Sequence, residues 1–115
     1  MVYIHIPYCR THCTYCAFYS ELLPRGGGSD AFVRALCSEI AASAEQRLPE
    51  DDQAPHTLYI GGGTPSLLTV DQLRSIVEAV RGAGWSFDRE FTLEVNPDDV
   101  VRGGLRYAEA LCEIG

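Results

Sequence analysis

Three short apolar segments, each followed by a loop and then a helical pattern, constrain the fold of this chain most strongly. Residues 2–6, 57–60 and 90–95 are rich in β-branched and aromatic side chains, which is typical of strands. Strands that alternate with helices usually pair in parallel. The sequence therefore predicts an α/β fold in which the loops after the three strands share one edge of the sheet.

Three helices are expected after these strands. Ser29 or Asp30 can cap the first helix, which should end near Leu48–Pro49. Thr69 and Gln72 have the spacing of a capping box and should begin the second helix. The third helix should carry an apolar stripe and end at a glycine cap: Leu105, Ala108, Leu111, Cys112 and Gly115.

Composition excludes several classes of protein. The chain has 115 residues, and nine basic against sixteen acidic residues give a net charge of −7, without a basic run. Nucleic-acid binding requires positive charge to neutralise phosphates, so no DNA or RNA partner is expected. The apolar stretch at the N-terminus is too short for a signal peptide or a membrane span, which predicts a cytoplasmic protein.

The βα units bear on domain organisation. Three of them cannot close a barrel, and a sheet of three parallel strands leaves an edge unpaired. We therefore expect residues 1–115 to be the N-terminal part of a larger domain whose remaining strands lie beyond Gly115.

Three cysteines predict a metal site. Cys9, Cys13 and Cys16 fall within eight residues, directly after the first strand, where their thiolates can converge on one centre. Three protein thiolates leave one iron of a four-iron cluster free to bind a small molecule, which favours chemistry over a structural role. A zinc site that recruits His5 or His12 is the alternative.

Two further cysteines and several other side chains are expected to be structural. Cys37 and Cys112 stand alone in helical patterns and are interpreted as small core residues, because free cysteine is often buried. We also expect core positions for three aromatic side chains and a solvated acidic loop: Trp85, Phe87 and Phe91, and Glu50, Asp51 and Asp52.

A glycine turn follows the second predicted strand, and a carboxylate lies within the third. Gly61–Gly63 can bring the backbone close to a ligand without Cβ obstruction, although a plain tight turn would also use such residues. Glu94 interrupts the apolar segment 91–95 and is either a solvent-facing residue or a buried carboxylate with a partner. Tyr3 and Tyr15 have ordinary packing as their simplest explanation.

Taken together, four motifs resemble those of a known family. Cys9-x3-Cys13-x2-Cys16 is similar to the radical S-adenosyl-L-methionine (SAM) signature. Residues 3–9, residues 61–66 and Glu94-x-Asn96-Pro97 resemble motifs of the oxygen-independent coproporphyrinogen III oxidase group, in the same order. The resemblance implies the first three βα units of a partial TIM-type (β/α)6 barrel, with a [4Fe-4S] cluster on the three cysteines.

The resemblance also implies how SAM is bound. SAM would chelate the free iron of the cluster through its amino and carboxylate groups. The residues implied to contact it come from the strands and loops described above: Tyr3, Tyr15, Gly62, Gly63, Thr64 and Glu94.

One departure from the family pattern bears on function. The oxidases carry a fourth cysteine two positions after the third, where this chain has Phe18. Its loss resembles the heme chaperone branch, which implies binding of SAM and heme, an electron donor protein and delivery of heme to membrane proteins. The alternative that the resemblance leaves open is oxidative decarboxylation of coproporphyrinogen III. The heme-binding segments would lie beyond Gly115.

Overall fold

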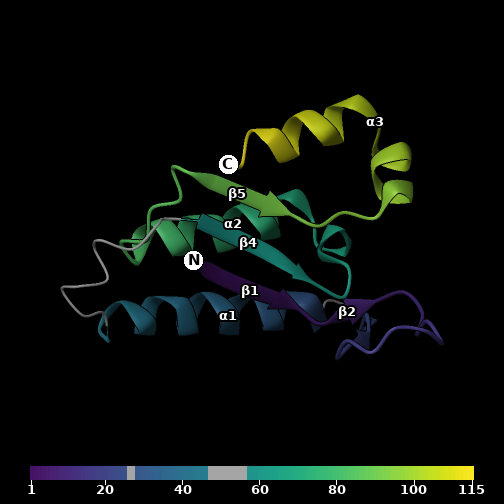
Figure 1. The fold of residues 1–115 in the computed structure, drawn as a ribbon, viewed down its shortest axis with the longest axis horizontal. Helices are drawn as coiled ribbons and strands as arrows, with labels where there is room; N and C mark the ends of the chain where they lie inside the picture. Colours follow the sequence, from purple (N-terminus) through teal and green to yellow (C-terminus); the bar gives the residue numbers. More distant parts are fainter. Residues whose placement is uncertain (26–27, 47–56) are drawn as a thin grey trace.

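The computed structural model describes residues 1–25, 28–46 and 57–115 (Figure 1). Its elements in chain order are β1 (Val2–Ile6), β2 (Tyr8–Cys9), β3 (Glu21–Leu22), α1 (Gly28–Ala44), β4 (Thr57–Gly62), the 3-10 helix η2 (Pro65–Leu67), α2 (Val70–Gly82), β5 (Glu90–Leu93) and α3 (Pro97–Cys112).

The main sheet is parallel and has the order β1-β4-β5. Ile4 pairs with Ile60, and Ile60 pairs with Leu93, so the three strands are in register along their length. Their carboxyl ends point to the same side of the molecule, where β2, the cysteine loop and the start of α3 also lie (Figure 1). The predicted α/β class is confirmed, and so is the prediction that the loops after the three strands share one edge of the sheet.

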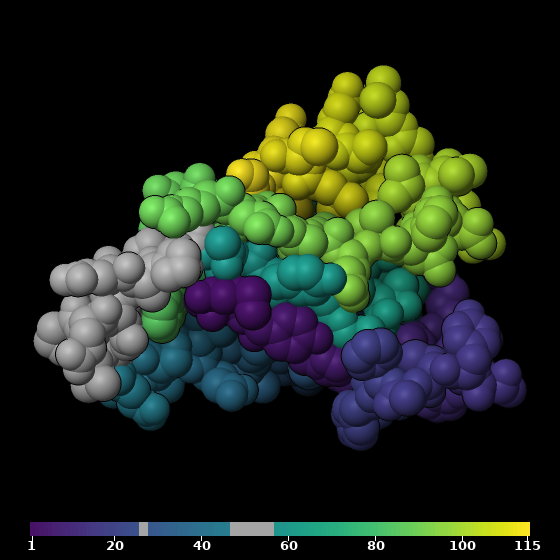
Figure 2. Space-filling model, viewed as in Figure 1, coloured from purple at the N-terminus to yellow at the C-terminus, as the bar shows by residue number. Residues whose placement is uncertain are grey.

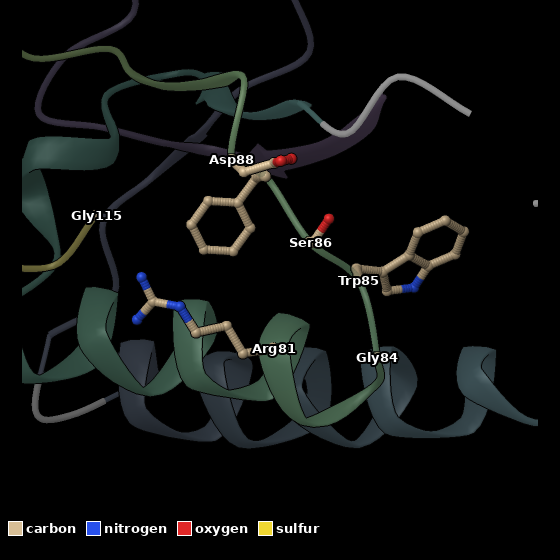
Figure 3. Close-up of a pocket in the computed structure, with 7 residues that line it drawn as sticks. Arg81, Gly84, Trp85, Ser86, Asp88 and Gly115 are labelled. Carbon is tan, nitrogen blue, oxygen red and sulfur yellow. The ribbon is translucent and has the colours of Figure 1, made fainter. Parts of the chain in front are cut away.

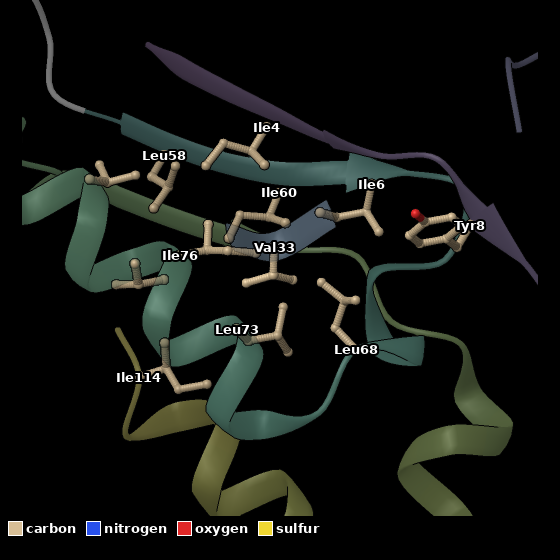
Figure 4. Packing of buried hydrophobic residues seen from close by; sticks show 12 residues of the cluster. Ile4, Ile6, Tyr8, Val33, Leu58, Ile60, Leu68, Leu73, Ile76 and Ile114 are labelled. Atoms are coloured by element: carbon tan, nitrogen blue, oxygen red, sulfur yellow. The ribbon is translucent and has the colours of Figure 1, made fainter. Parts of the chain in front are cut away.

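Alternation along the strands divides the sheet into two faces. Ile4 and Ile60 point toward α1 and α2 and are almost fully buried with Val33, Leu73 and Ile76 (Figure 4). None of the helices in the described residues covers the opposite face, and Figure 2 shows β1, β4 and β5 at the surface there. The fold therefore has one closed apolar layer and one exposed sheet face.

The second helix forms as the sequence predicts. Thr69 Oγ1 accepts a hydrogen bond from Gln72 N at 3.2 Å, and Gln72 Oε1 accepts one from Thr69 N at 2.9 Å, which completes the capping box. The apolar stripe of the helix is buried against the sheet and α1: Leu73, Ile76, Val77 and Val80.

The first helix differs from its prediction at its start. It begins at Gly28, so Ser29 and Asp30 are not caps but lie in its first turn, where both side chains accept hydrogen bonds from Gln72 Nε2. The helix ends at Ala44. The predicted end at Leu48–Pro49 and the acidic residues Glu50, Asp51 and Asp52 lie outside the described residues.

The third helix bends, and this corrects part of the predicted core. Gly104 has φ 66° and ψ −167°, a conformation that interrupts the helix and that glycine adopts easily. Leu105 is 74% exposed, and Cys112 is exposed too, so neither belongs to the core. The cap is Glu113 rather than Gly115. Of the remaining expectations, the three aromatic side chains are half-buried against the core: Trp85, Phe87 and Phe91.

Two short strands at the base of the cysteine loop have no counterpart in the sequence prediction. β2 and β3 pair in parallel, with Tyr8 opposite Glu21 and Cys9 opposite Leu22. They are too short for periodicity to reveal them. Among the described residues, no helix is long and apolar enough to span a membrane.

Candidate functional site

Hydrogen bonds tie the glycine turn after β4 to the first strands. Gly63 N donates to Ile6 O at 2.7 Å, and Thr64 N donates to Tyr8 O at 2.7 Å. The turn therefore lies beside the point where the chain leaves β1 and enters the cysteine loop. Two motifs that are about fifty residues apart in the sequence are joined at the carboxyl edge of the sheet.

Steric contacts explain why this turn consists of glycines. Gly62 has φ 118°, and a Cβ there would lie 2.8 Å from the His5 ring and from Ile6 O. A Cβ on Gly63 would lie 2.5 Å from Tyr8 O and 3.0 Å from Cys9 Sγ. Because side chains do not fit at these distances, the close approach of the two loops depends on glycine.

Glu94 lies across the edge from this turn. Its Oε1 accepts a hydrogen bond of 2.6 Å from Tyr59 Oη, and its Oε2 accepts one of 3.0 Å from Gly62 N. The hydrogen bond to Glu94 raises the pKa of Tyr59, so this hydroxyl remains a donor at neutral pH. The carboxylate is thus held in place by two donors from β4.

The surroundings of Glu94 correct its predicted position. β5 ends at Leu93, so Glu94 follows the strand instead of lying inside it, and its side chain is exposed, which agrees with the solvent-facing alternative. Glu94 N still donates to Ile60 O at 3.0 Å, which extends the pairing by one bond. The carboxylate therefore has partners and also access to solvent.

A cavity of about 390 Å³ lies between the glycine turn and the start of α3. Gly63, Thr64 and Glu94, three of the residues predicted to bind SAM, line it together with Pro65 and residues 95–97. Exposed backbone groups, a hydroxyl and a carboxylate thus surround a space of the size that small ligands occupy.

A second cavity, of about 530 Å³, lies at the far end of the sheet, between the end of α2 and Gly115 (Figure 3). The Arg81 guanidinium lies 4.9 Å from the centre of the Phe87 ring beside it. None of the predicted site residues lines this cavity. It therefore stands apart from the candidate site.

The first cysteine lies against the glycine turn. Cys9 Sγ is 3.8 Å from Thr64 Oγ1, within reach of a weak hydrogen bond from this hydroxyl. Leu23 N donates to Cys9 O at 3.0 Å and Glu21 N donates to Pro7 O at 2.6 Å, so β2 and β3 close the base of the cysteine loop. Both ends of the loop are anchored at the carboxyl edge.

The other two cysteines are not gathered around Cys9. Cys13 and Cys16 are exposed and form one turn of the loop, in which Cys16 N donates to Cys13 O at 3.1 Å. In the part of the chain that the structure describes, no group of three or more His, Cys, Asp or Glu side chains is arranged to hold a metal ion. The three thiols are free, so the donor set matches an iron–sulfur cluster in chemistry and number while the sulfurs do not converge.

The two histidines of the zinc alternative have other neighbours. His5 is half-buried, and its ring nitrogens form hydrogen bonds of 3.0 Å with Tyr3 Oη and 3.1 Å with Tyr19 O. His12 Nδ1 lies 3.5 Å from Ser20 Oγ. Both ring nitrogens of His5 thus have partners within the chain.

The predicted tyrosines lie at different places. Tyr3 is on the open sheet face, with its ring 5.9 Å from that of Tyr59, the partner of Glu94. Tyr15 is 89% exposed in the cysteine loop, where a hydrogen bond with Cys13 raises its pKa. Tyr3 thus adjoins the glycine and carboxylate side of the site, whereas Tyr15 adjoins a cysteine.

A polar network at this edge was missed from the sequence. Ser66 Oγ donates to Asp99 Oδ2 at 2.6 Å, and the Arg10 guanidinium lies 2.6 Å from Asp99 Oδ1. These residues come from three separate segments, and each looks like an ordinary surface residue in its own segment. The only sequence signal for this network is that each of the three residues lies next to a predicted motif.

Comparison with known proteins identifies the family of this chain. Heme chaperone HemW of Mycobacterium tuberculosis (strain ATCC 25618 / H37Rv) is 37% identical over 100 residues, which make up 84% of this chain and 25% of that protein. A solved structure of coproporphyrinogen III oxidase (HemN) from Escherichia coli, described as a radical SAM enzyme, matches 98% of this chain with a TM-score of 0.81 and 27% identity. The chain belongs to the coproporphyrinogen III oxidase-like group of the radical SAM superfamily. No family model matches it.

The relatives of this radical SAM chain include both chaperones and oxidases. The oxygen-independent coproporphyrinogen III oxidase of Bradyrhizobium diazoefficiens is 31% identical over 97 residues, or 84% of this chain and 21% of that protein. The chain spans about a quarter of the length of the relatives it matches. Radical SAM membership implies a [4Fe-4S] cluster and SAM, and the three βα units correspond to part of the barrel.

Proposed function

We propose that this chain is the N-terminal part of a radical SAM heme chaperone, which holds a [4Fe-4S] cluster on Cys9, Cys13 and Cys16 and binds SAM at the glycine turn. The observation that carries this proposal is the contact of Cys9 with Gly63 and Thr64, because it puts a thiol beside the cavity that Glu94 lines. One small molecule can therefore bind both to a metal centre on the cysteines and to the backbone of the glycine turn.

Each part of the site has a definite task in this proposal. When bound, the reduced cluster supplies the electron that cleaves the sulfonium C–S bond of SAM. The backbone groups of Gly62, Gly63 and Thr64 hold the amino and carboxylate groups of SAM, which glycine allows to come close. Glu94 accepts hydrogen bonds from ribose or amino groups, and Tyr59 fixes its orientation. Tyr3 and Tyr15 border the site.

Heme delivery is favoured over porphyrinogen oxidation by Phe18. This residue occupies the position of the fourth cysteine of the oxidases and is 73% exposed. The sequence identity to HemW also supports the heme chaperone branch. We propose that heme binds to segments beyond residue 115 and passes to a membrane protein, with reduction by an electron donor protein. Five free cysteines favour a reducing compartment, hence the cytoplasm.

The oxidase remains the second candidate because an enzyme of that activity is among the relatives. Two assays on the complete gene product separate the candidates: titration with heme followed by visible absorption, and anaerobic turnover of coproporphyrinogen III with SAM and a reductant. The proposal expects saturable binding of heme and no decarboxylation. Decarboxylated product without saturable heme binding would contradict it.

A further inference from the structure

The polar network around Asp99 joins all three motifs of the candidate site. Arg10 directly follows Cys9, Ser66 closes the glycine motif, and Asp99 lies in the first turn of α3 after Asn96-Pro97. Asn96 N donates to Ser66 Oγ at 3.0 Å, and Ser66 Oγ in turn donates to Asp99 Oδ2. One hydroxyl therefore connects the glycine loop to the start of α3.

Asp99 is a buried charged residue at the centre of this network. Asp99 is 8% exposed, and a carboxylate removed from water requires charged or hydrogen-bonding partners. Ser66 Oγ occupies one of its oxygens, and the Arg10 guanidinium lies 2.6 Å from the other. The position in the first turn of α3 adds a favourable interaction between the negative charge and the helix dipole. Asp99 is thus a fixed anion at the carboxyl edge of the sheet.

Arg10 connects this anion to the cysteine loop. Its side chain is 49% exposed, so it contributes little to the apolar core. Its backbone is one peptide bond from Cys9, which is paired through β2 with β3. An ion pair at Arg10 and strand pairing at Cys9 therefore restrain the same point of the loop.

We propose that Arg10 and Asp99, with Ser66, are positioning residues that hold Cys9 against the glycine turn and so slow the release of the cluster. The inference rests on the proposed cluster. These three residues are not ligands themselves. A cluster held by only three protein ligands is retained better when one of those ligands, Cys9, is restrained.

The test compares three variants of the complete gene product after anaerobic reconstitution with iron and sulfide. Arg10→Gln removes the cation, Arg10→Lys keeps it, and Arg102→Gln removes an exposed arginine whose charge also acts on Asp99. The rate of cluster loss in EDTA is followed by visible absorption, and thermal unfolding of the cluster-free proteins is followed by circular dichroism.

We expect Arg10→Gln to lose its cluster roughly tenfold faster than the wild type, with Arg10→Lys in between and Arg102→Gln unchanged. Arg10→Gln leaves buried Asp99 without its cation and should lower the thermal midpoint of the cluster-free protein, whereas Arg10→Lys and Arg102→Gln should stay close to the wild type. Equal rates for Arg10→Gln and the wild type, or a rate that only follows the thermal midpoint, would overturn the inference. If the wild type itself takes up no cluster, the proposed function fails instead, and the two failures are thus distinguishable.

Discussion

The glycine turn and the cysteine loop lie at the same edge of the sheet but are held very differently. The turn is bonded to β1 and β2 by Gly63 N and Thr64 N, and neighbouring backbone and side-chain atoms leave no space for a Cβ there. The cysteine loop is anchored at its ends, whereas Cys13 and Cys16 are exposed. The part predicted to bind SAM is therefore built by sheet packing, and the part predicted to bind metal depends on its own side chains.

This difference separates two sources of local order. Strand pairing and burial fix the turn, so a change there should act on folding. Metal–thiolate bonds contribute directly to the order of the segments that supply the ligands. A change in the cysteine loop should consequently act on cofactor content and leave the fold intact.

The largest expected effect comes from Cys13→Ser, which removes a proposed ligand from an exposed position. After anaerobic reconstitution we expect loss of the cluster, measured as iron and sulfide per chain, with an unchanged thermal midpoint for the metal-free protein. The matched control is Cys112→Ser, an exposed cysteine in α3. A full cluster in Cys13→Ser, or an equal loss of cluster in Cys112→Ser, would contradict the proposal that the cysteine loop determines cofactor content.

The next effect in size concerns Glu94→Gln. The carboxylate would no longer offer a charge to SAM, and hydrogen bonds to charged groups are worth about 1.5–3 kcal/mol, so SAM should bind roughly ten- to a hundredfold more weakly. Equilibrium dialysis of labelled SAM measures this. Glu90→Gln, at the start of β5, is the control, because the Glu90 carboxylate accepts a hydrogen bond from Thr92 instead. Unchanged affinity in Glu94→Gln would remove this residue from the site.

A smaller effect is expected on stability when a glycine of the turn is replaced. Gly63→Ala would bring a Cβ to within 2.5 Å of Tyr8 O, and overpacking of this kind costs about 1–3 kcal/mol in the free energy of unfolding. Gly82→Ala is the control: nothing lies within 4 Å of that Cβ, so a gain of about 0.5–1 kcal/mol is expected in the helix. Chemical denaturation measures both. Equal stability of Gly63→Ala and the wild type would show that the turn yields more easily than its contacts indicate.

The smallest expected effect is on pH dependence. Burial raises the pKa of Asp99, but the hydrogen bond from Ser66 and the charge of Arg10 outweigh it, so the pKa lies below its ordinary value of 3.8. Ionised Asp99 therefore stabilises the fold above this value, and the contribution is lost as the pH falls through the lower, folded-state pKa. The thermal midpoint of the wild type should exceed that of Asp99→Asn at neutral pH and converge with it below about pH 4. A constant difference across this range would contradict the assignment.

Local sequence predicted the features of the site that depend on short patterns. β1, the capping box at Thr69 and the glycine turn follow from residues that are close in the chain, and the parallel sheet follows from their order. The bend at Gly104 exposed Leu105, because a single left-handed glycine rotates the face of a helix that periodicity assumes to be continuous.

Long-range polar contacts could not be predicted in the same way. Arg10 and Asp99 are about ninety residues apart in sequence, and nothing in either segment indicates a partner. Burial decides this pairing, since it makes an isolated carboxylate unfavourable and so couples segments whose sequences are independent. The position of Glu94 has a different cause: β5 ends at Leu93, two residues before the end of the apolar segment 91–95.

The central claim is that Cys9, Cys13 and Cys16 hold a cluster whose free iron binds SAM beside the glycine turn. Electron–nuclear double resonance of the reconstituted, reduced protein with SAM labelled by ¹⁵N in its amino group tests this most directly. The account predicts a hyperfine coupling between the label and the cluster. A protein that binds zinc in place of iron, or a cluster whose spectrum is the same with and without labelled SAM, would contradict it.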